Sequence, residues 1–579
     1  MLHNRRTLVA ALSIFAFAVA CSDSSGPLAP NPILGLSTTA VNTTSIRLTF
    51  NSAAGDNSYD VERAEGAAGA FAQVITVPAP AIPGPVSYTD ANLKVNTAYR
   101  YRIITNRDGL KSIPSGESSV TTLTFGFAAA ELSTDITANR TLFADTAYTL
   151  KGFVHVANGA TLTIQPGTII KGDFNTLGSS LWILRGAKIE AVGRADAPIV
   201  FTSSRTTGRQ PGDWGGLVIV GNALTNRVAT VEIEGSGTDG ATVAGGKNYQ
   251  VLYSGGTTAT DNSGTLSYVR VEFAGFAPSL NNELNSFTFA AVGSGTRASY
   301  LQAMGGLDDS FEWFGGGFDA DHLVAYESGD DMFDMSEGFN GRLSFLVGYN
   351  SVQLTPRTGA GFFSSDLNGI ENDGCSGSGC TSGFNTAPFT VPLVANFTLV
   401  GCGDVACAGS GGGYGMMLRR GTGGYYVNGV VARFPRAGVS LRDAETFVRA
   451  GSLAVTDVAI ADLAVRNVLF TEVAGNVFQA GGGSTVQNSL ELAGNSLSGS
   501  STAAALFTSI PTTGSMPSSV AAFDWTPPTG AAISAGGLGT LSGKLGAKGG
   551  TVVTGTAYLG AAAPGGTKWW SGWTTYVRN

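Results

Sequence analysis

The segments LDDSFEWFGG at 307–316 and GDDMFDMSEG at 329–338 are near-copies of each other, 22 residues apart. Their matched acidic positions are Asp308 with Asp330, Asp309 with Asp331, and Glu312 with Asp334. A repeat of this length is typical of a solenoid, in which each repeat forms one coil stacked on the previous one. The pattern therefore predicts columns of carboxylates on neighbouring coils, whose strands lie about 4.8 Å apart.

Short β-rich runs separated by Gly, Asn and Asp continue through residues 131–579. The intervals from Tyr300 to His322 and from His322 to Ser344 are both 22 residues. Each run has apolar residues at alternate positions, as stacked parallel strands require. The fold class predicted for this region is a right-handed parallel β-helix, although a propeller or a second sandwich would also use short strands.

The composition fits an extended all-β protein with at least two domains. The 579 residues include 81 glycines, and only 13 % are charged. Glycine and β-branched residues suit tight turns and strands. A net charge of −8 without a basic patch gives no reason to expect a nucleic-acid partner.

The first 20 residues have the pattern of a signal peptide, with Arg5 and Arg6 preceding a short apolar stretch. Its end, AVAC, resembles the lipobox of bacterial lipoproteins, in which the cysteine, here Cys21, is lipidated. The resemblance implies a membrane anchor, and Ser22 after the cysteine implies the outer membrane and cell surface. Residues 21–32 read as a Ser/Pro/Gly tether. An ordinary cleaved signal peptide is the alternative.

Residues 33–124 alternate apolar and polar residues in short runs, which predicts a β-sandwich. The run LKVNTAYRYRI, with Leu93, Tyr99, Tyr101 and Ile103, resembles the tyrosine-corner region of fibronectin type III domains. Phe50 stands where that family usually has a core tryptophan. The resemblance implies a spacer or contact module.

The four remaining cysteines form two closely spaced pairs, Cys375 with Cys380 and Cys402 with Cys407. An even number in an exported protein favours disulfides over a four-thiolate zinc site. Local bridges and bridges between the two pairs are both compatible with the spacing.

Several motifs of the second region resemble a group of exported bacterial β-helix proteins and lipoproteins in Bacteroidetes-like lineages. They are GATLTIQPGTIIKGD, PGDWGGLVIVGNA, DNSGTLSYVRVEFAG, DDSFEWFGG and YLGAAAPGGTKWWSGWT. The resemblance covers nearly all of residues 131–579 and implies the β-helix fold and an exported setting. It implies no particular reaction.

The doubled aspartates are the best candidates for a binding site. The carboxylates that would share a calcium ion, which takes six to eight oxygen ligands, are Asp308, Asp309, Glu312, Asp330, Asp331 and Asp334. The alternative is a row of turn aspartates that accept hydrogen bonds from nearby backbone N–H groups. Two adjacent aspartates in each copy are more than turn chemistry needs.

Evidence for catalysis is weaker. The nearby groups that a lyase could use as a base are His322, Arg342 and Arg357, and no motif distinguishes one of them. His322 falls in a strand, which favours a structural role. No Gly-x-Ser-x-Gly motif or Ser/His/Asp arrangement is present.

Aromatic residues form two groups. Those beside the acidic repeats, which suggest sugar stacking on an exposed tryptophan, are Trp313, Phe314, Phe318 and Phe333. Trp569, Trp570 and Trp573 near the C-terminus are expected to cap the last open coil.

Taken together, these features predict a cell-surface lipoprotein with a non-catalytic binding or adhesion role towards glycans or other surface polymers. The alternative is a calcium-dependent polysaccharide lyase or glycoside hydrolase that acts through the acidic coils at 308–334.

Overall fold

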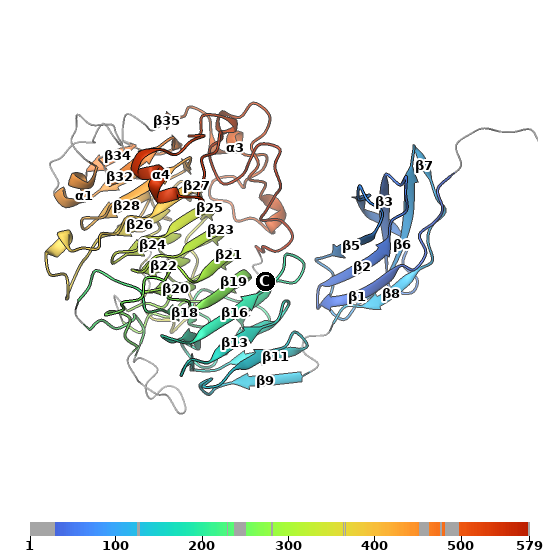
Figure 1. Cartoon of the computed structure of the whole chain (residues 1–579), viewed down its shortest axis with the longest axis horizontal. Helices are drawn as coiled ribbons and strands as arrows, with labels where there is room; N and C mark the ends of the chain where they lie inside the picture. The colour runs from blue at the N-terminus through green and yellow to red at the C-terminus, as the bar shows by residue number, and fades with distance from the viewer. Residues whose placement is uncertain are drawn as a thin grey trace, which may run out of the picture. The chain divides into compact units, whose positions relative to one another are not determined.

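The computed structural model describes residues 29–123, 128–228, 230–236, 251–279, 282–362, 364, 366–450, 462–474, 477–480 and 497–576. The predicted signal peptide, Cys21 and most of the tether lie outside these residues. The chain forms two compact units, of which the main parts are residues 46–90 with 97–121 in the first and residues 122–579 in the second. Both units are built almost entirely from strands, so the all-β prediction is confirmed (Figure 1).

The N-terminal unit is a sandwich of two antiparallel sheets that resembles a fibronectin type III domain. One sheet has the order β1 (Ser37–Asn42), β2 (Ser45–Asn51) and β5 (Pro85–Asp90). The other consists of β4 (Ala72–Pro78), β3 (Ser58–Glu65), β6 (Ala98–Arg107) and β7 (Leu110–Lys111), with β8 (Ser118–Thr121) paired to β6. Alternate residues of β2 and β6 are buried between the sheets, as period-two alternation requires.

The buried tyrosines of β6 account for the predicted corner motif. Tyr101 is fully buried, and its hydroxyl donates a hydrogen bond of 2.8 Å to Asp90 on β5. Phe50 packs edge-on against Tyr59 at 4.9 Å, so a phenyl ring occupies the core position where the related family has tryptophan. Arg63 pairs with Asp90 at 2.9 Å and keeps the buried carboxylate compensated.

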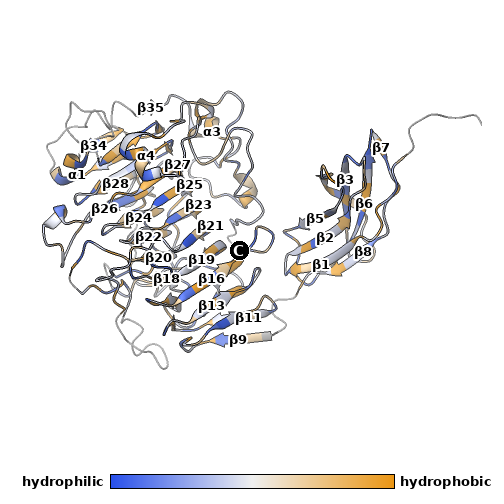
Figure 2. Ribbon diagram, in the orientation of Figure 1, coloured by the Kyte–Doolittle hydropathy of each residue, from blue (hydrophilic) through white to orange (hydrophobic). Residues whose placement is uncertain are grey.

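The second unit is a parallel β-helix made of two long parallel sheets. The ten-stranded sheet runs through β12 (Phe153–Val156), β15 (Ser180–Ile183), β18 (Gly216–Val220), β20 (Phe287–Ala290), β22 (Phe311–Phe314), β24 (Phe333–Ser336), β26 (Ile370–Asp373), β28 (Tyr414–Arg419), β31 (Ala437–Leu441) and β34 (Phe478–Ala480). Hydrophobic and hydrophilic residues alternate along many of these strands (Figure 2).

The seventeen-stranded sheet forms the rest of each coil. Its first strands are β9 (Ala128–Leu132), β10 (Arg140–Leu142), β11 (Thr146–Leu150), β13 (Thr161–Ile164), β14 (Ile169–Gly172), β16 (Lys188–Val192) and β17 (Ile199–Ser203). The central and last strands are β19 (Gly264–Glu272), β21 (Arg297–Met304), β23 (Asp319–Tyr326), β25 (Arg342–Tyr349), β27 (Leu393–Val400), β29 (Gly424–Val427), β30 (Val430–Ala432), β32 (Leu463–Arg466), β33 (Leu469–Thr471) and β35 (Leu497–Ser498). In the central coils one long strand replaces the two short strands of the outer coils, since β16 and β17 both pair with β19.

The long strands bend at one equivalent position each, and the paired short strands that follow them in the sheet are separated at the same position. The bend residues of the long strands, with φ between 49° and 57°, are Tyr268, Tyr300, His322, Phe345 and Asn396, and Asn428 and Asn467 take the same conformation between the short strands. A positive φ turns the backbone without ending the strand, at some cost for a residue with a Cβ atom. Tyr300 and His322 occupy equivalent positions on neighbouring coils, 22 residues apart as predicted. The predicted equivalence of His322 and Ser344 is wrong by one residue. Ser344 pairs with Asp321, and His322 stacks on Phe345 at 4.9 Å.

Aromatic side chains of the acidic repeats fill the interior of the helix. Phe311 stacks on Phe287 at 4.9 Å and on Phe333 at 5.5 Å, in columns along the coil axis. Such stacking contributes about 0.5–1.5 kcal/mol per pair beyond the area it buries. The phenylalanine of each repeat is therefore a core residue that fixes the register of the coils.

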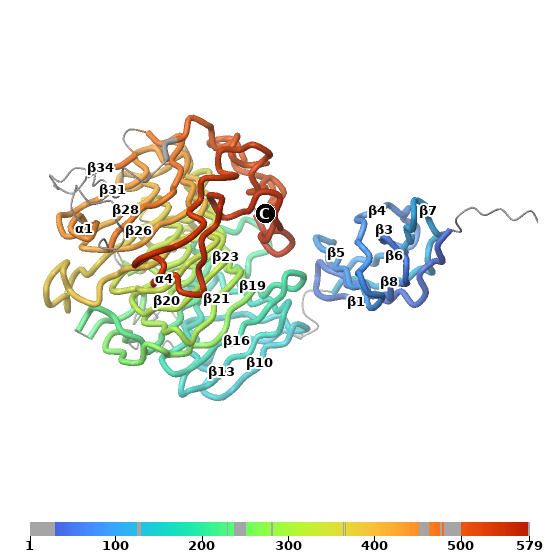
Figure 3. The backbone as a smooth tube through the Cα atoms, turned by 45° about the horizontal axis from the view of Figure 1, so that its top comes forward, coloured from blue at the N-terminus to red at the C-terminus, as the bar shows by residue number. Residues whose placement is uncertain are grey.

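The C-terminal segment covers the side of the helix rather than its end. It runs along the seventeen-stranded sheet (Figure 3), where Trp525 donates to the Tyr326 hydroxyl at 3.0 Å and Gln302 accepts from the Thr575 amide at 2.8 Å. Trp573 lies 5.6 Å from Tyr268, in a central coil. The predicted capping of the last coil by Trp569, Trp570 and Trp573 is therefore wrong. These side chains cover an apolar outer face instead.

Helices are few and short in the described part of the chain. They are α1 (Ala444–Arg449), α3 (Ala503–Leu506) and α4 (Gly543–Gly549), with single 3-10 turns at Gly383–Asn385, Val520–Ala522 and Ala532–Ser534. None of these described helices has the length and apolarity needed to traverse a lipid bilayer. The cysteines form two local disulfides, Cys375–Cys380 and Cys402–Cys407, so the prediction of disulfides is confirmed.

Candidate functional site

The doubled aspartates lie in two equivalent turns on neighbouring coils. Asp308 and Asp309 are in the turn from β21 to β22, and Asp330 and Asp331 are in the turn from β23 to β24. The turns stack directly because Glu312 on β22 pairs with Asp334 on β24. The 22-residue repeat therefore aligns the carboxylates as the sequence predicts.

The second aspartate of each pair belongs to a hydrogen-bonded ladder between coils. Asp309 Oδ1 accepts the Asp331 amide of the next coil at 2.7 Å, and Asp331 Oδ1 accepts the Asn368 amide at 3.1 Å. The same bond is made by Asn285 to the Asp309 amide and by Asn368 to the Tyr414 amide. Two asparagines thus do the same work as the two aspartates. The predicted turn chemistry is present, and it uses Asp309 and Asp331.

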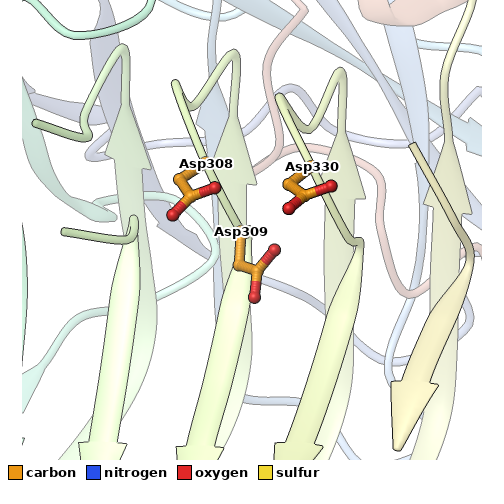
Figure 4. Close-up of side chains that lie close together, drawn as sticks. All are labelled: Asp308, Asp309 and Asp330. Carbon is orange, nitrogen blue, oxygen red and sulfur yellow. The ribbon is translucent and has the colours of Figure 1, made fainter. Parts of the chain in front are cut away.

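The first aspartate of each pair faces a cavity and leaves acceptor atoms free. Asp308 is only 8 % exposed, and among the described residues nothing donates a hydrogen bond to its carboxylate. Asp330 Oδ1 and Asp334 Oδ1 are buried and also without a donor in the described part of the chain. Figure 4 shows Asp308 and Asp330 side by side on neighbouring turns, with Asp309 below them in this view.

The cavity has a volume of about 540 Å³ and lies on the outer face of the ten-stranded sheet. The acidic residues that line it are Glu234, Glu283, Asp308, Asp309, Glu312, Asp330, Asp331, Asp334, Glu337, Glu371 and Asp373. The basic residues that line it are Arg227, Arg419 and Arg420. Carboxylates therefore outnumber cationic side chains by a wide margin.

The three arginines are engaged by carboxylates on one side of the cavity. Arg227 pairs with Glu337 at 2.5 Å, Arg419 pairs with Asp373 at 2.8 Å and with Glu371, and Arg420 pairs with Asp373 at 2.5 Å. These pairs are close because Asp373 on β26 is in register with Arg419 on β28. The arginines therefore form ion pairs with Glu337, Glu371 and Asp373.

Seven carboxylates on the other side have no ion pair within the described residues. They are Glu234, Asp308, Asp309, Glu312, Asp330, Asp331 and Asp334. Two groups of three bring carboxylate oxygens within 4.8 Å of one another, and Asp309 belongs to both. One group adds Asp308 and Asp330, and the other adds Asp331 and Asp334.

Burial and mutual repulsion raise the pKa of these carboxyl groups, because both disfavour the charged form. The pKa of Asp330 is raised to about 7, and those of Glu234 and Glu371 are raised to about 8, with burial the largest cause in each case. Burial, followed by the charge of Asp330, raises the pKa of Asp308 well above its ordinary value. A bound cation would remove this repulsion and allow the groups to ionise.

The donor set fits a hard divalent cation. Calcium takes carboxylate oxygens in flexible geometry, and each group of three offers up to six of them. The buried acceptor atoms of Asp330 and Asp334 that lack a donor are the kind of atom that such an ion satisfies. The predicted metal ligands are therefore gathered in one place, with Glu312 beside them on β22.

Comparison with known proteins adds a family for the second unit. The family model described as a pectate-lyase-like β-helix domain matches residues 134–511. The chain belongs to this family. No curated protein matches the chain.

Solved structures match a smaller part of the chain. A structure of titin domains A168–A170 is 26 % identical, with a TM-score of 0.15, and covers 16 % of this chain and 32 % of its own. The chain thus spans about a third of that titin structure. An Fn3-like protein from Clostridium thermocellum is 28 % identical, with a TM-score of 0.15, and covers 17 % of this chain and 94 % of its own. A human fibronectin type III domain is 25 % identical, with a TM-score of 0.15, and covers 17 % of this chain and 93 % of its own.

The basic residues that the sequence offered as catalytic groups lie away from the cavity of this pectate-lyase-like domain. Arg342 pairs with Asp319 at 2.6 Å, and Arg357 stacks on the ring of Phe174 at 3.8 Å. His322 stacks on Tyr300 at 4.4 Å in the bend of the coil. The expected structural role of His322 fits this position, whereas the placement of these three residues beside the acidic site is wrong.

Sugar stacking on an exposed tryptophan is also not supported. Trp313, Phe318 and Phe333 are at most 1 % exposed and belong to the interior of the β-helix. Phe314 lines the cavity and contacts Tyr253 at 5.5 Å. Strand alternation explains the result, because Trp313 points to the same side as Phe311 and Glu312 points to the other.

Sequence reasoning missed the residues that reach the cavity from outside the repeat. Arg227 and Glu234 belong to an insertion between β18 and β19, and no repeat marks them. Arg419 and Arg420 end strand β28, two coils beyond Asp334. The sequence could place these residues only through the length of each coil. That length varies from 22 to 46 residues in this part of the chain.

Proposed function

We propose that this protein is an exported, lipid-anchored surface protein whose β-helix binds glycans or other surface polymers at the acidic cavity. Calcium bound by the doubled aspartates would stiffen the acidic coils. Membership of the pectate-lyase-like β-helix family supports a polysaccharide-related role. The lipobox-like AVAC sequence at 18–21 supports lipidation of Cys21 and an outer-membrane location.

The observation that carries the proposal is the set of seven cavity carboxylates without an ion pair among the described residues. Buried like charges within a few ångströms cost several kcal/mol unless a cation or protons intervene. Such a set therefore lowers the stability of the free protein, and a bound cation or cationic ligand would offset that cost. The site also has the volume of an ordinary ligand pocket, about 300–1,000 Å³.

A lyase that uses an arginine of the cavity as its base is disfavoured, because these arginines are poor proton acceptors. A lyase needs a group that accepts a proton near neutral pH. Arg227 and Arg419 are paired with carboxylates, which raise the pKa of both guanidinium groups further. Neither would lose its proton under these conditions.

A glycoside hydrolase is the second candidate, and one observation favours it. Hydrolysis needs one carboxyl group that stays protonated beside one that is ionised. Asp330, whose pKa is raised to about 7, would serve as the acid. A neighbouring carboxylate of the cavity would serve as the base or nucleophile.

Calorimetric titration with calcium tests the first part of the proposal. We expect one or more calcium ions to bind at millimolar concentrations or below. Asp309→Asn should weaken binding most, because Asp309 is common to both groups while asparagine preserves the ladder hydrogen bond. Asp145→Asn, an exposed turn substitution, is the matched control and should leave binding unchanged. Absence of heat at millimolar calcium would contradict the calcium site.

Incubation with neutral, uronic-acid and amino polysaccharides tests the second part. Retention on a glycan array without turnover supports the binding protein. New reducing ends support the hydrolase, and products with ultraviolet absorbance support a lyase. If no glycan is retained and none is cleaved, the proposed function is wrong.

A further inference from the structure

The carboxyl groups of the cavity outnumber the charges that one calcium ion can neutralise. Seven of them lack an ion pair among the described residues, whereas one divalent cation compensates two charges. The groups that calcium leaves uncompensated are ionised or protonated, and neither form carries a positive charge. A polyanion such as a uronic-acid polymer would be repelled by every group that is ionised and attracted by none of them.

The cavity arginines do not offset this repulsion. Arg227, Arg419 and Arg420 already donate to Glu337, Glu371 and Asp373. Each of these guanidinium charges is already compensated, so an incoming carboxylate would have to compete with the carboxylates of the protein. The basic residues of the site are therefore structural partners of its acidic residues.

The group formed by Asp308, Asp309 and Asp330 fits an alkylammonium. An ammonium has three donors and no acceptor, so it matches a site made only of acceptors. Three hydrogen bonds of about 2.8 Å along tetrahedral directions need acceptors roughly 4.6 Å apart. The oxygens of this group lie within 4.8 Å of one another.

The acceptor oxygens of these side chains that lack a hydrogen-bond donor support this assignment. Asp308 is more than nine-tenths buried, lines the cavity and has no donor among the described residues. The Oδ1 atom of Asp330 is likewise without a donor. Asp309 uses Oδ1 for the ladder bond to Asp331, which leaves Oδ2 for a ligand. Asp331 and Asp334, with a share of Asp309, remain for calcium.

We infer that the glycan bound at this cavity is an amino-sugar polymer, whose protonated amine binds between Asp308, Asp309 and Asp330. The inference rests on the proposed glycan-binding function and specifies the ligand class. The family background suggests acidic polysaccharides, whereas the charge of this cavity selects a cationic one.

The test compares two hexasaccharides with the same backbone, one of glucosamine and one of N-acetylglucosamine. Binding to the purified protein is measured by calorimetry near neutral pH with saturating calcium. We expect the glucosamine hexamer to bind about tenfold or more tightly, since only its protonated amine donates charge-assisted hydrogen bonds to the three carboxylates. Asp308→Asn, measured at the same saturating calcium concentration, should remove most of this difference, because Asp308 is one of the three acceptors of the ammonium.

Three further measurements decide the outcome. Equal binding of the two hexamers, or tighter binding of oligogalacturonate, overturns the inference and leaves the proposed function standing. Binding of a lysine hexapeptide as tight as that of the glucosamine hexamer overturns the assignment to a sugar. Failure of every glycan to bind overturns the inference and the proposed function together. If only the amino-sugar hexamer fails to bind, the inference is overturned and the proposed glycan-binding function stands. Asp145→Asn serves as the control and should preserve the tenfold preference.

Discussion

The central coils of the β-helix carry two opposite kinds of outer face. On β21, β23 and β25 the outward residues include a buried apolar group with Met304, Tyr326 and Tyr349, which packs against the C-terminal segment. On β22, β24 and β26 the outward residues are Glu312, Asp334 and Glu371, which line the cavity. The same coils thus bury one face against their own chain and direct carboxylates into a cavity on the other. The difference indicates that the first face serves stability and the second serves binding.

The largest effect is expected from breaking the covered face. Trp573→Ala should lower the free energy of unfolding of the β-helix by about 3–5 kcal/mol, because Trp573 is fully buried against the central coils. Urea denaturation followed by tryptophan fluorescence measures the change. Calcium affinity should stay within twofold, since the side chain does not line the cavity. A large loss of calcium affinity in a folded variant would mean that the two faces are coupled.

A pH dependence is expected from the acidic face alone. Carboxyl groups with a raised pKa bind protons more tightly in the folded state, so stability is greatest at low pH and falls as the pH rises. For Asp330 and Glu371 the window runs from ordinary values of 3.8 and 4.5 up to about 7 and about 8. Each unit of raised pKa costs about 1.4 kcal/mol at the alkaline end.

Thermal unfolding in a chelator, followed between about pH 5 and pH 8, measures this slope. We expect the melting temperature to fall with rising pH and the slope to flatten with saturating calcium, which stabilises by mass action. Asp330→Asn should also flatten it, because it removes one of the repelling charges. A melting temperature that rises over this range would show that the cavity carboxylates are ionised without cost.

The repeat predicts the fold well because one short motif satisfies several constraints at once. Phe311 and Phe333 stack in the core while Asp309 and Asp331 bond the next turn, so a fixed interval preserves both. The alternation of side chains along β22 also predicts that Trp313 points into the core with Phe311. The prediction of sugar stacking did not take this alternation into account. Arg227, in contrast, reaches the cavity from an insertion. Its position depends on a loop path that no local pattern specifies.

The smallest effects separate the two aspartates of each pair. Asp309→Ala leaves the Asp331 amide without its acceptor, whereas Asp309→Asn retains an acceptor as Asn285 and Asn368 do. The alanine variant should therefore be less stable than the asparagine variant by about 1–3 kcal/mol. Asp308→Ala and Asp308→Asn should differ by less than about 0.5 kcal/mol, since no described residue donates to Asp308.

Urea denaturation of these four variants in a chelator gives both differences under one condition. Because alanine and asparagine each remove one negative charge, the comparison cancels the relief of repulsion and isolates the hydrogen bond. Equal differences at the two positions would contradict the division of the pair into a ladder residue and a ligand residue. A difference confined to Asp309 would leave Asp308 without a structural role at this turn. Binding would then be the remaining reason for a buried carboxylate at that position.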